Sequence, residues 1–418
     1  MTDTALHGGK PRLAWTRNDT IWLLSLFGTA VGAGILFLPI NAGIGGFWPL
    51  VVMTVLIGPM TYLSHRGLSR FVCSGSKPDA DITEVVVEHF GARAGQYITI
   101  LYFLAIYPIV LIYGVGITNT VGSFMENQLG MGAPPRWILS GVLIAAMMVV
   151  MIAGERIMLV VTQWLVYPLA AILIFLSIYL IPSWNLAAIK QVTPMGTALK
   201  TIWLTLPVLI FSFNHSPAIS QFSVAMRRDY GADGSAKADQ ILRNTAGMLV
   251  GFVMLFVFSC VLALTPEQLV EAKQQNLPVL SYLANAHGST FVAIFGPAIA
   301  FAAIVSSFFG HYMGAAEGLK GILRGKIVSE EAAASPGMDR AIALFIFLTT
   351  WAVAVINPSI LGMIEMLSGP VIAAILYLMP MYAISKVPAL AQYRGQLSNV
   401  FVTVSGLVAV SAIFYAMF

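Results

Sequence analysis

The sequence predicts an all-α membrane protein of eleven transmembrane helices, arranged as two repeats of five helices and one extra helix. The chain of 418 residues is 58% hydrophobic and 10% charged, with a mean hydropathy of +0.85. That is more apolar surface than one water-soluble core of this length can bury. Apolar runs of spanning length recur along the chain, and glycine, proline or polar residues interrupt the first and the sixth of them.

Each expected helix is an apolar run of about 20 residues. The runs are residues 21–40, 46–65, 96–124, 137–153, 157–181, 201–225, 244–264, 291–316, 340–357, 360–384 and 398–418. Residues 1–20 are a basic tail without the apolar segment of a signal peptide, so a cytoplasmic tail is expected. Residues 21–418 are expected to form one domain. Its parts are a first repeat at about 21–181, a second at about 201–384 and the extra helix at 398–418.

Two segments between the spans are expected to contain further helix. Residues 79–93 mix acids with apolar positions, which indicates a short surface helix leading into the third span. Residues 265–288 open with Thr-Pro-Glu-Gln, a typical helix start, and indicate a helical hairpin over the outer end.

The basic residues predict how the chain sits in the membrane. Of the 22 Lys and Arg residues, only Arg136, Lys190, Lys200 and Lys273 fall on the side opposite the N-terminal tail. Because cytoplasmic loops carry an excess of Lys and Arg, we expect a cytoplasmic N-terminus and a periplasmic or extracellular C-terminus. The net charge of +4 is scattered over short loops, so no nucleic-acid surface is expected.

The interruptions in the first and sixth spans indicate a ligand site. They are Gly28–Pro39 (GTAVGAGILFLP) and Pro207–Pro217 (PVLIFSFNHSP). A helix in hydrocarbon keeps its backbone groups bonded to one another, so breaks are tolerated where the freed groups face a cavity or a ligand. Broken helices at equivalent positions of two halves predict an inverted five-plus-five repeat, with the ligand held near the bilayer midplane. This pattern is typical of transporters.

At the two breaks and beyond them, the chain resembles the bacterial serine/threonine permeases of the hydroxy and aromatic amino acid permease family, in the APC superfamily. The resemblance covers essentially the whole chain, including the segments between spans. The residues that carry it are Gly28–Gly46, Phe211–Ser216 (FSFNHS), Ser307–Tyr312 (SFFGHY), Asn357–Glu365 (NPSILGMIE), His65–Leu68, Asp81–Val85 and Leu378–Ile384.

The resemblance implies a LeuT-like fold and a cation-coupled symporter that imports L-serine across the bacterial inner membrane by alternating access. L-threonine stays open as a second substrate. An amino acid exchanger, or a transporter-like sensor without ion coupling, is the alternative. Polar residues cluster at the breaks and form no continuous pore, which argues against a channel. We expect no enzyme activity, no cofactor apart from Na⁺ or H⁺, and no partners except a small neutral amino acid and lipid. The sequence leaves the oligomeric state open.

A zwitterionic substrate requires hydrogen-bond donors for its carboxylate and acceptors for its ammonium group. The first break supplies backbone N–H groups at Ala33, Gly34 and Ile35, beside the positive end of a half-helix. Gly32, with Gly28 and Gly34, lets a ligand approach the backbone closely, although small residues also serve helix packing. The expected acceptors for the ammonium group are the carbonyls around Thr29, Phe211 and Asn214.

Polar side chains in the sixth span are candidates for recognising the substrate side chain. Ser212, Asn214 and His215 lie together in an apolar segment, and polar groups inside a bilayer usually line a cavity. A site that bonds a substrate hydroxyl rejects analogues that lack it. Tyr113 in the third span is a further candidate, with ordinary core packing as the alternative.

The resemblance also implies one sodium site between the first and eighth spans. In the LeuT-like fold, this site uses carbonyls of helix one together with one carbonyl and two hydroxyls of helix eight. The matching residues here are Gly28, Val31, Ala303, Ser306 and Ser307. Oxygen ligands of this kind suit a small, hard cation.

The coupling ion stays open between Na⁺ and H⁺. The fold's second sodium site uses an asparagine where this chain has Ile35, so at most one sodium ion is expected. Several relatives carry a lysine at the position of Ser306, whose ammonium can replace the ion, and this chain departs from them. For a proton, the candidates are Glu365 and His215, since carboxylates within a bilayer are often functional; a structural role for Glu365 is the alternative. His311 is interpreted as a gate or packing group.

Overall fold

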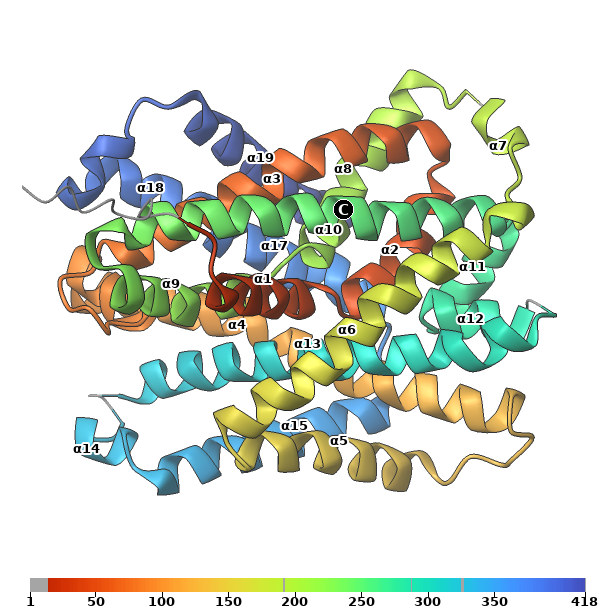
Figure 1. Ribbon diagram of the computed structural model, residues 1–418, viewed down its shortest axis with the longest axis horizontal. Helices are drawn as coiled ribbons and strands as arrows, with labels where there is room; N and C mark the ends of the chain where they lie inside the picture. The colour runs from red at the N-terminus through yellow and green to blue at the C-terminus, as the bar shows by residue number, and fades with distance from the viewer. Residues whose placement is uncertain (1–13, 191, 287, 325–326, 418) are drawn as a thin grey trace, which may run out of the picture.

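The computed structural model describes residues 14–190, 192–286, 288–324 and 327–417. The described chain is almost entirely helical, and the long helices run side by side along the long axis of the view (Figure 1). The helices of the first half are α1 (Arg17–Ala30), α2 (Ala33–Ile44), α3 (Phe47–Cys73), α4 (Ile82–Asn127), α5 (Arg136–Ile152), α6 (Glu155–Tyr179), η1 (Ile181–Ser183) and α7 (Ala187–Lys190).

The second half begins with a further broken helix, and its later helices include two π-helical segments, η3 and η4. These helices are α8 (Met195–Ser212), α9 (Ser216–Tyr230), η2 (Gly231–Asp233), α10 (Gly234–Ala263), α11 (Pro266–Gln274), α12 (Val279–Ala286), α13 (Thr290–Leu323), α14 (Glu330–Ala333), α15 (Pro336–Ile356), α16 (Ile360–Met363), η3 (Ile364–Ser368), α17 (Gly369–Ala373), η4 (Ala374–Leu378), α18 (Met379–Lys386), η5 (Pro388–Tyr393) and α19 (Leu397–Met417).

Every expected span has a helix in the structure. Within the described residues, eight helices are long and apolar enough to cross a membrane, and the bent pair α1 and α2 makes a ninth. Two shorter apolar helices, Arg136–Ile152 and Leu397–Ala412, lie at the fourth and eleventh expected spans. The prediction of an all-helical, multi-pass membrane protein is therefore confirmed.

The helices between and beyond the expected spans differ in detail from the sequence prediction. Helix α3 continues eight residues past the expected end to Cys73, so His65–Leu68 lie within a helix rather than between spans. Leu378–Ile384 likewise lie at the end of η4 and in α18. The expected surface helix is present as the start of α4, which bends at Gly91 (φ 79°), a backbone conformation that favours glycine. The expected outer hairpin is present as α11 and α12.

Both expected breaks are present. The axes of α1 and α2 differ by 51° across Val31 and Gly32. Three residues, Phe213 to His215, separate α8 from α9. Residues on both sides of each break are buried, so the freed backbone groups lie in the interior of the helix bundle rather than at its lipid-facing surface.

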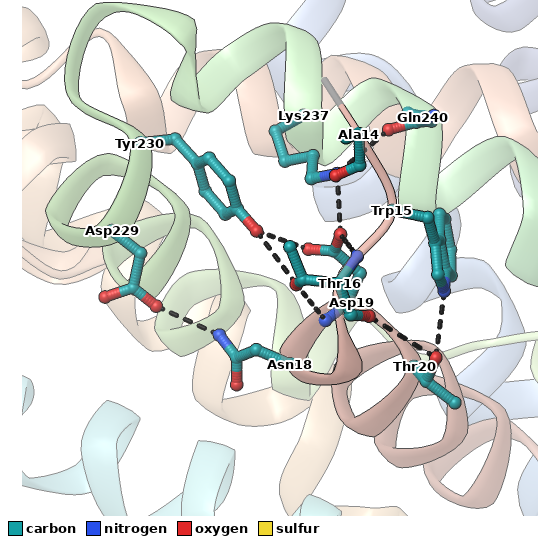
Figure 2. Close-up of polar contacts among 10 residues, drawn as sticks. All are labelled: Ala14, Trp15, Thr16, Asn18, Asp19, Thr20, Asp229, Tyr230, Lys237 and Gln240. Atoms are coloured by element: carbon teal, nitrogen blue, oxygen red, sulfur yellow. Dashed lines mark hydrogen bonds and ion pairs between the residues drawn. The ribbon is translucent and has the colours of Figure 1, made fainter. Parts of the chain in front are cut away.

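A buried ion pair ties the start of α1 to α10. Lys237 Nζ lies 2.6 Å from Asp19 Oδ2, and both side chains are fully buried (Figure 2). Tyr230, at the end of α9, donates to Asp19 Oδ1 at 2.7 Å, and the Thr16 N–H donates to Asp19 Oδ2 at 2.7 Å. Lys237 also donates to the Ala14 carbonyl at 2.9 Å. The N-terminal half of the first span is thereby fixed to α9 and α10.

Replacing one member of this pair is expected to destabilise the protein. Asp19→Asn leaves the Lys237 ammonium buried without its carboxylate, which costs about 3–5 kcal/mol of folding free energy. Asp229→Asn is the control, because the Arg228–Asp229 pair is exposed and such pairs contribute about 0–1 kcal/mol. Thermal unfolding of the purified protein in detergent would measure both variants. Equal melting temperatures for the two variants would contradict the role assigned to the buried pair.

Candidate functional site

The first break presents the N-terminal end of α2 inside the protein. Gly32 is the N-cap residue of α2 and has no side chain. It therefore provides no side-chain acceptor for the backbone N–H groups in the first turn, at Ala33, Gly34 and Ile35. The three residues are fully or almost fully buried. An uncapped helix N-terminus in the interior attracts a negatively charged group, which fits the carboxylate of an amino acid.

Ser307 of α13 contacts the same break at its α1 side. Its Oγ donates to the Thr29 carbonyl at 2.6 Å and lies 2.6 Å from the hydroxyl of Tyr113 in α4. A Cβ at Gly32 would collide with Ser307 and would lie 2.8 Å from the Tyr113 hydroxyl. The glycine therefore allows close approach of α4 and α13 to the broken helix, and Tyr113 lies beside the break.

The two breaks contact each other through Ser212. Its Oγ lies 2.8 Å from the Gly34 carbonyl and 2.7 Å from the carbonyl of Val208 in its own helix. A Cβ at Gly34 would lie 2.6 Å from Ser212 Cα and 2.8 Å from the Phe211 ring. Close contact between α2 and α8 at this point thus requires glycine on one side, and Ser212 acts on the backbone of the first break.

The second break contains two buried polar groups without partners and a stacked pair of histidines. Asn214 Nδ2 and His215 Nε2 have no hydrogen-bond partner among the described residues. The His215 ring stacks on His65 of α3, with ring centroids 3.6 Å apart. The His215 N–H donates to His65 Nε2 at 3.1 Å, and His65 Nδ1 lies 2.8 Å from the Thr61 carbonyl. Asn214 Nδ2 and His215 Nε2 are therefore unsatisfied side-chain groups buried at the second break.

Sequence reasoning did not identify His65. Its position next to Arg66 at the end of an apolar run suggested the edge of the membrane, but α3 continues and buries it to 1% exposure. A second histidine in an apolar run was the available signal, because buried polar side chains in a membrane protein are usually paired or functional.

Of the residues expected to bind the cation, Ser306 lines a small cavity. Ser306 and Thr29 line a cavity of about 50 Å³ between α1, α6, α9 and α13. Ser306 Oγ donates to the Ala303 carbonyl at 3.2 Å. Gly28 and Val31 belong to the last turn and the C-cap of α1, next to the Thr29 carbonyl that Ser307 contacts. The hydroxyl of Ser307 thus contacts the end of α1, and Ser306 lies one residue away on α13 beside the cavity.

Glu365 lies at the opposite end of the protein from Asp19, in η3. Its Oε1 accepts a hydrogen bond from Asn41 of α2 at 2.6 Å and lies 3.4 Å from Lys273 Nζ of α11. The side chain is 30% exposed. Glu365 thus joins α2, the second half of the broken first span, to α11 of the hairpin.

The loop between α11 and α12 is hydrogen-bonded to its neighbours at this end of the protein. Asn276 Nδ2 donates to the Pro358 carbonyl at 2.9 Å, and Asn276 Oδ1 accepts from the Ile360 N–H at 2.9 Å. Asn119 of α4 donates to the Asn276 carbonyl at 3.0 Å. The hairpin is therefore hydrogen-bonded both to the third span and to the segment that opens the tenth.

The cavity beside Ser306 leads toward the N-terminal end of α1. It shares Trp22, Gln221 and Met313 with a larger pocket of about 570 Å³, which we call the inner vestibule. Further lining residues of the vestibule include Asp81, Glu317 and Asp339. The cavity beside Ser306 thus adjoins the vestibule at the N-terminal face.

The structure brings most of the expected substrate residues together at the breaks. Hydrogen bonds or close approach connect Thr29, Gly32, Gly34, Tyr113, Phe211, Ser212 and Ser307. Asn214 and His215 lie at the second break on the side of α3, and Ala33 and Ile35 lie in the first turn of α2. His311 is one turn beyond Ser307, its Nδ1 2.9 Å from the Ser307 carbonyl.

A bundle of spanning helices with two broken helices around buried polar groups defines a membrane transport protein. A family model for the tryptophan/tyrosine permease family matches residues 21–416, so the chain belongs to that family. Membership of a permease family makes the chain a transporter rather than an enzyme.

Curated relatives and solved structures extend this assignment. The chain is 55% identical over 417 residues to the serine transporter SdaC of Escherichia coli (strain K12), covering 97% of this chain and 96% of the relative. It is 54% identical to SdaC of Shigella flexneri, with the same coverage. MhsT in complex with L-phenylalanine superposes with a TM-score of 0.60 at 16% identity, over 98% of this chain and 99% of MhsT.

A second solved structure has the same fold. The substrate-bound, outward-open state of a Na⁺-coupled sialic acid symporter superposes with a TM-score of 0.60 at 15% identity, over 95% of this chain and 90% of that chain. The LeuT-like fold implied by the sequence is therefore confirmed, with its five-plus-five inverted repeat and broken first and sixth helices.

Removing the Ser212 hydroxyl is expected to destabilise the contact between the breaks. Ser212→Ala removes the hydroxyl that lies between the Gly34 and Val208 carbonyls, and the loss of one net hydrogen bond costs about 0.5–1.5 kcal/mol. Ser385→Ala is the control, because Ser385 is exposed and its hydroxyl bonds within its own helix. Melting temperatures in detergent would test this, and an unchanged value for Ser212→Ala would rule out the proposed stabilising role.

Proposed function

We propose that this chain is a cation-coupled symporter that imports L-serine by alternating access. The observation that carries the proposal is 55% identity to a serine transporter along nearly the whole length of both chains. The geometry of the breaks supports it, because both signs of a zwitterion find complementary groups in one buried place. L-threonine is a second candidate substrate.

The substrate is proposed to lie between the two breaks. Its carboxylate binds the N–H groups at the start of α2, and its ammonium group binds carbonyls near Thr29, Phe211 and Asn214. The partnerless Asn214 Nδ2 and His215 Nε2 are available to the serine hydroxyl. A buried polar site of this kind rejects analogues without the hydroxyl, because its own groups would be left unpaired.

The N-terminal face is proposed to be cytoplasmic and the C-terminus periplasmic, in the bacterial inner membrane. The distribution of Lys and Arg residues supports this orientation. With this orientation, the hairpin of α11 and α12 closes the outer end, and the inner vestibule leads to the cytoplasm. We further propose that residues 21–418 act as one transporter domain, with the repeats at about 21–181 and 201–384 and the extra helix at the end.

The coupling ion is proposed to be Na⁺ or H⁺. Supporting Na⁺, the hydroxyls of Ser306 and Ser307 lie next to the end of α1. For a proton, His215 is the candidate at the breaks, whereas the partners of Glu365 favour a role in outer closure. An exchanger without ion coupling is the alternative function.

Uptake by reconstituted protein would test the proposed function. Labelled L-serine is added to proteoliposomes with an inward Na⁺ gradient, an inward proton gradient or neither, and we expect saturable accumulation with one of the gradients. Liposomes without protein are the control. Exchange of internal and external serine with no effect of either gradient would favour the exchanger, and absence of serine flux would contradict the proposed substrate.

Removing the Ser306 hydroxyl is expected to weaken coupling to sodium. In Ser306→Ala, loss of about 1 kcal/mol of ion binding raises the Na⁺ concentration for half-maximal uptake about fivefold. The serine concentration for half-maximal uptake at saturating Na⁺ should stay near the wild-type value. Ser140→Ala is the control, because this buried hydroxyl bonds within α5. An equal rise in the Na⁺ and the serine concentrations for half-maximal uptake would argue against a dedicated ion site.

A further inference from the structure

Glu317 is an acid in the long apolar helix α13 that the proposed transport cycle does not yet use. It lines the inner vestibule. Its Oε1 is buried and has no hydrogen-bond partner among the described residues. A carboxyl oxygen in such a place is unfavourable unless a positive charge or a donor reaches it, and acids inside a membrane helix are candidates for ion pathways.

Other polar groups surround the same carboxyl. Ser220 and Gln221 of α9 lie next to Glu317 and also line the vestibule. Tyr102 of α4 lies close enough to interact with its charge, is 1% exposed, and has a buried hydroxyl without a partner among the described residues. Glu317 thus offers an unpartnered oxygen with polar neighbours, which suits a small cation or a protonated group.

The bases near Glu317 are engaged with other acids. Lys320 Nζ lies 2.6 Å from Asp339 Oδ1 of α15, and Arg324 lies 3.1 Å from Glu84 Oε1 of α4. The neighbouring Asp81 caps the start of α4, accepting from the N–H groups at positions 83 and 84. Two further charged side chains line the vestibule, Asp79 and Arg228. Within the described residues, the Glu317 carboxylate thus forms no ion pair.

Glu317 and Ser306 lie on the same face of α13. They are eleven residues apart, which is close to three full turns, about 16 Å along the axis. The cavity beside Ser306 and the inner vestibule, which Glu317 lines, share Trp22, Gln221 and Met313. One helix face therefore connects the expected cation site to the vestibule at the N-terminal face.

We propose that Glu317 is a second binding station for the coupling cation, which receives the ion from the Thr29–Ser306 cavity and releases it through the inner vestibule. This inference rests on the proposed function as a cation-coupled importer. Glu317 touches the ion on its exit route and does not contact the amino acid. It therefore affects the step in which the cation leaves, and it does not affect recognition of the substrate.

Two transport modes in proteoliposomes separate these steps. Net uptake of labelled serine needs release of the cation inside, whereas exchange of serine with equal cation concentration on both sides does not require net release. For Glu317→Gln we expect net uptake to fall about tenfold, from loss of a charged ligand worth roughly 1.5 kcal/mol. The rate of serine exchange should stay within about twofold of wild type, which corresponds to a difference of less than about 0.5 kcal/mol. The Na⁺ gradient and the pH gradient are applied in separate assays. The gradient that no longer stimulates net uptake in Glu317→Gln identifies the coupling cation.

Asp79→Asn is the matched control, because it removes one negative charge from the same vestibule and leaves Lys320 paired with Asp339. It should leave both modes near wild type, and Glu317→Asp, which keeps the charge, should restore part of the net uptake. Unchanged net uptake in Glu317→Gln would overturn the inference. Equal loss of net uptake and exchange in both Glu317 variants would also overturn it. In either case, cation-stimulated uptake by the wild-type protein would still support the proposed function. A wild-type protein without cation-stimulated uptake would overturn the proposed function and this inference together.

Discussion

The structure depends on one constraint: backbone groups freed inside a membrane must find partners within the protein. The two breaks release such groups at Thr29–Gly34 and at Phe213–Ser216. Ser307 satisfies the Thr29 carbonyl, Ser212 contacts the Gly34 carbonyl, and His65 accepts from the His215 N–H. Each partner comes from a different element, so the breaks hold together α1, α2, α3, α8 and α13. The start of α2 and the unpartnered Asn214 Nδ2 are where the substrate is proposed to bind.

The two ends of the protein are held by different interactions. At the N-terminal end, a fully buried ion pair joins α1 to α10, and strong pairs of this kind resist water and screening (Figure 2). At the other end, the contacts of Asn276 and Glu365 are hydrogen bonds and a partly exposed pair. Contacts of the second kind are weaker and easier to exchange with water, which suits a closure that must open in each transport cycle.

Particular residues show how far the site could be predicted. Gly32, Gly34 and Ser212 were identified because glycine and polar residues in an apolar helix have few structural explanations. Glu365 was chosen on the same reasoning, but its partners Asn41 and Lys273 are distant in sequence and place it at the outer end. His65 was missed because the end of its helix could not be located to within a turn. Glu317 was not identified, because only the folded structure shows that its buried oxygen has no hydrogen-bond partner.

By itself, the sequence determined the helical membrane class, the number and order of the spans, the positions of both breaks and the family. These depend on local composition and on residues close together in the chain, which hydrocarbon constrains strongly. Only the tertiary structure decided which polar groups meet: Ser307 with Thr29, Asp19 with Lys237, and His65 with His215. Such pairs join segments far apart in sequence, and helix packing sets their distances, which no pattern along a single helix specifies.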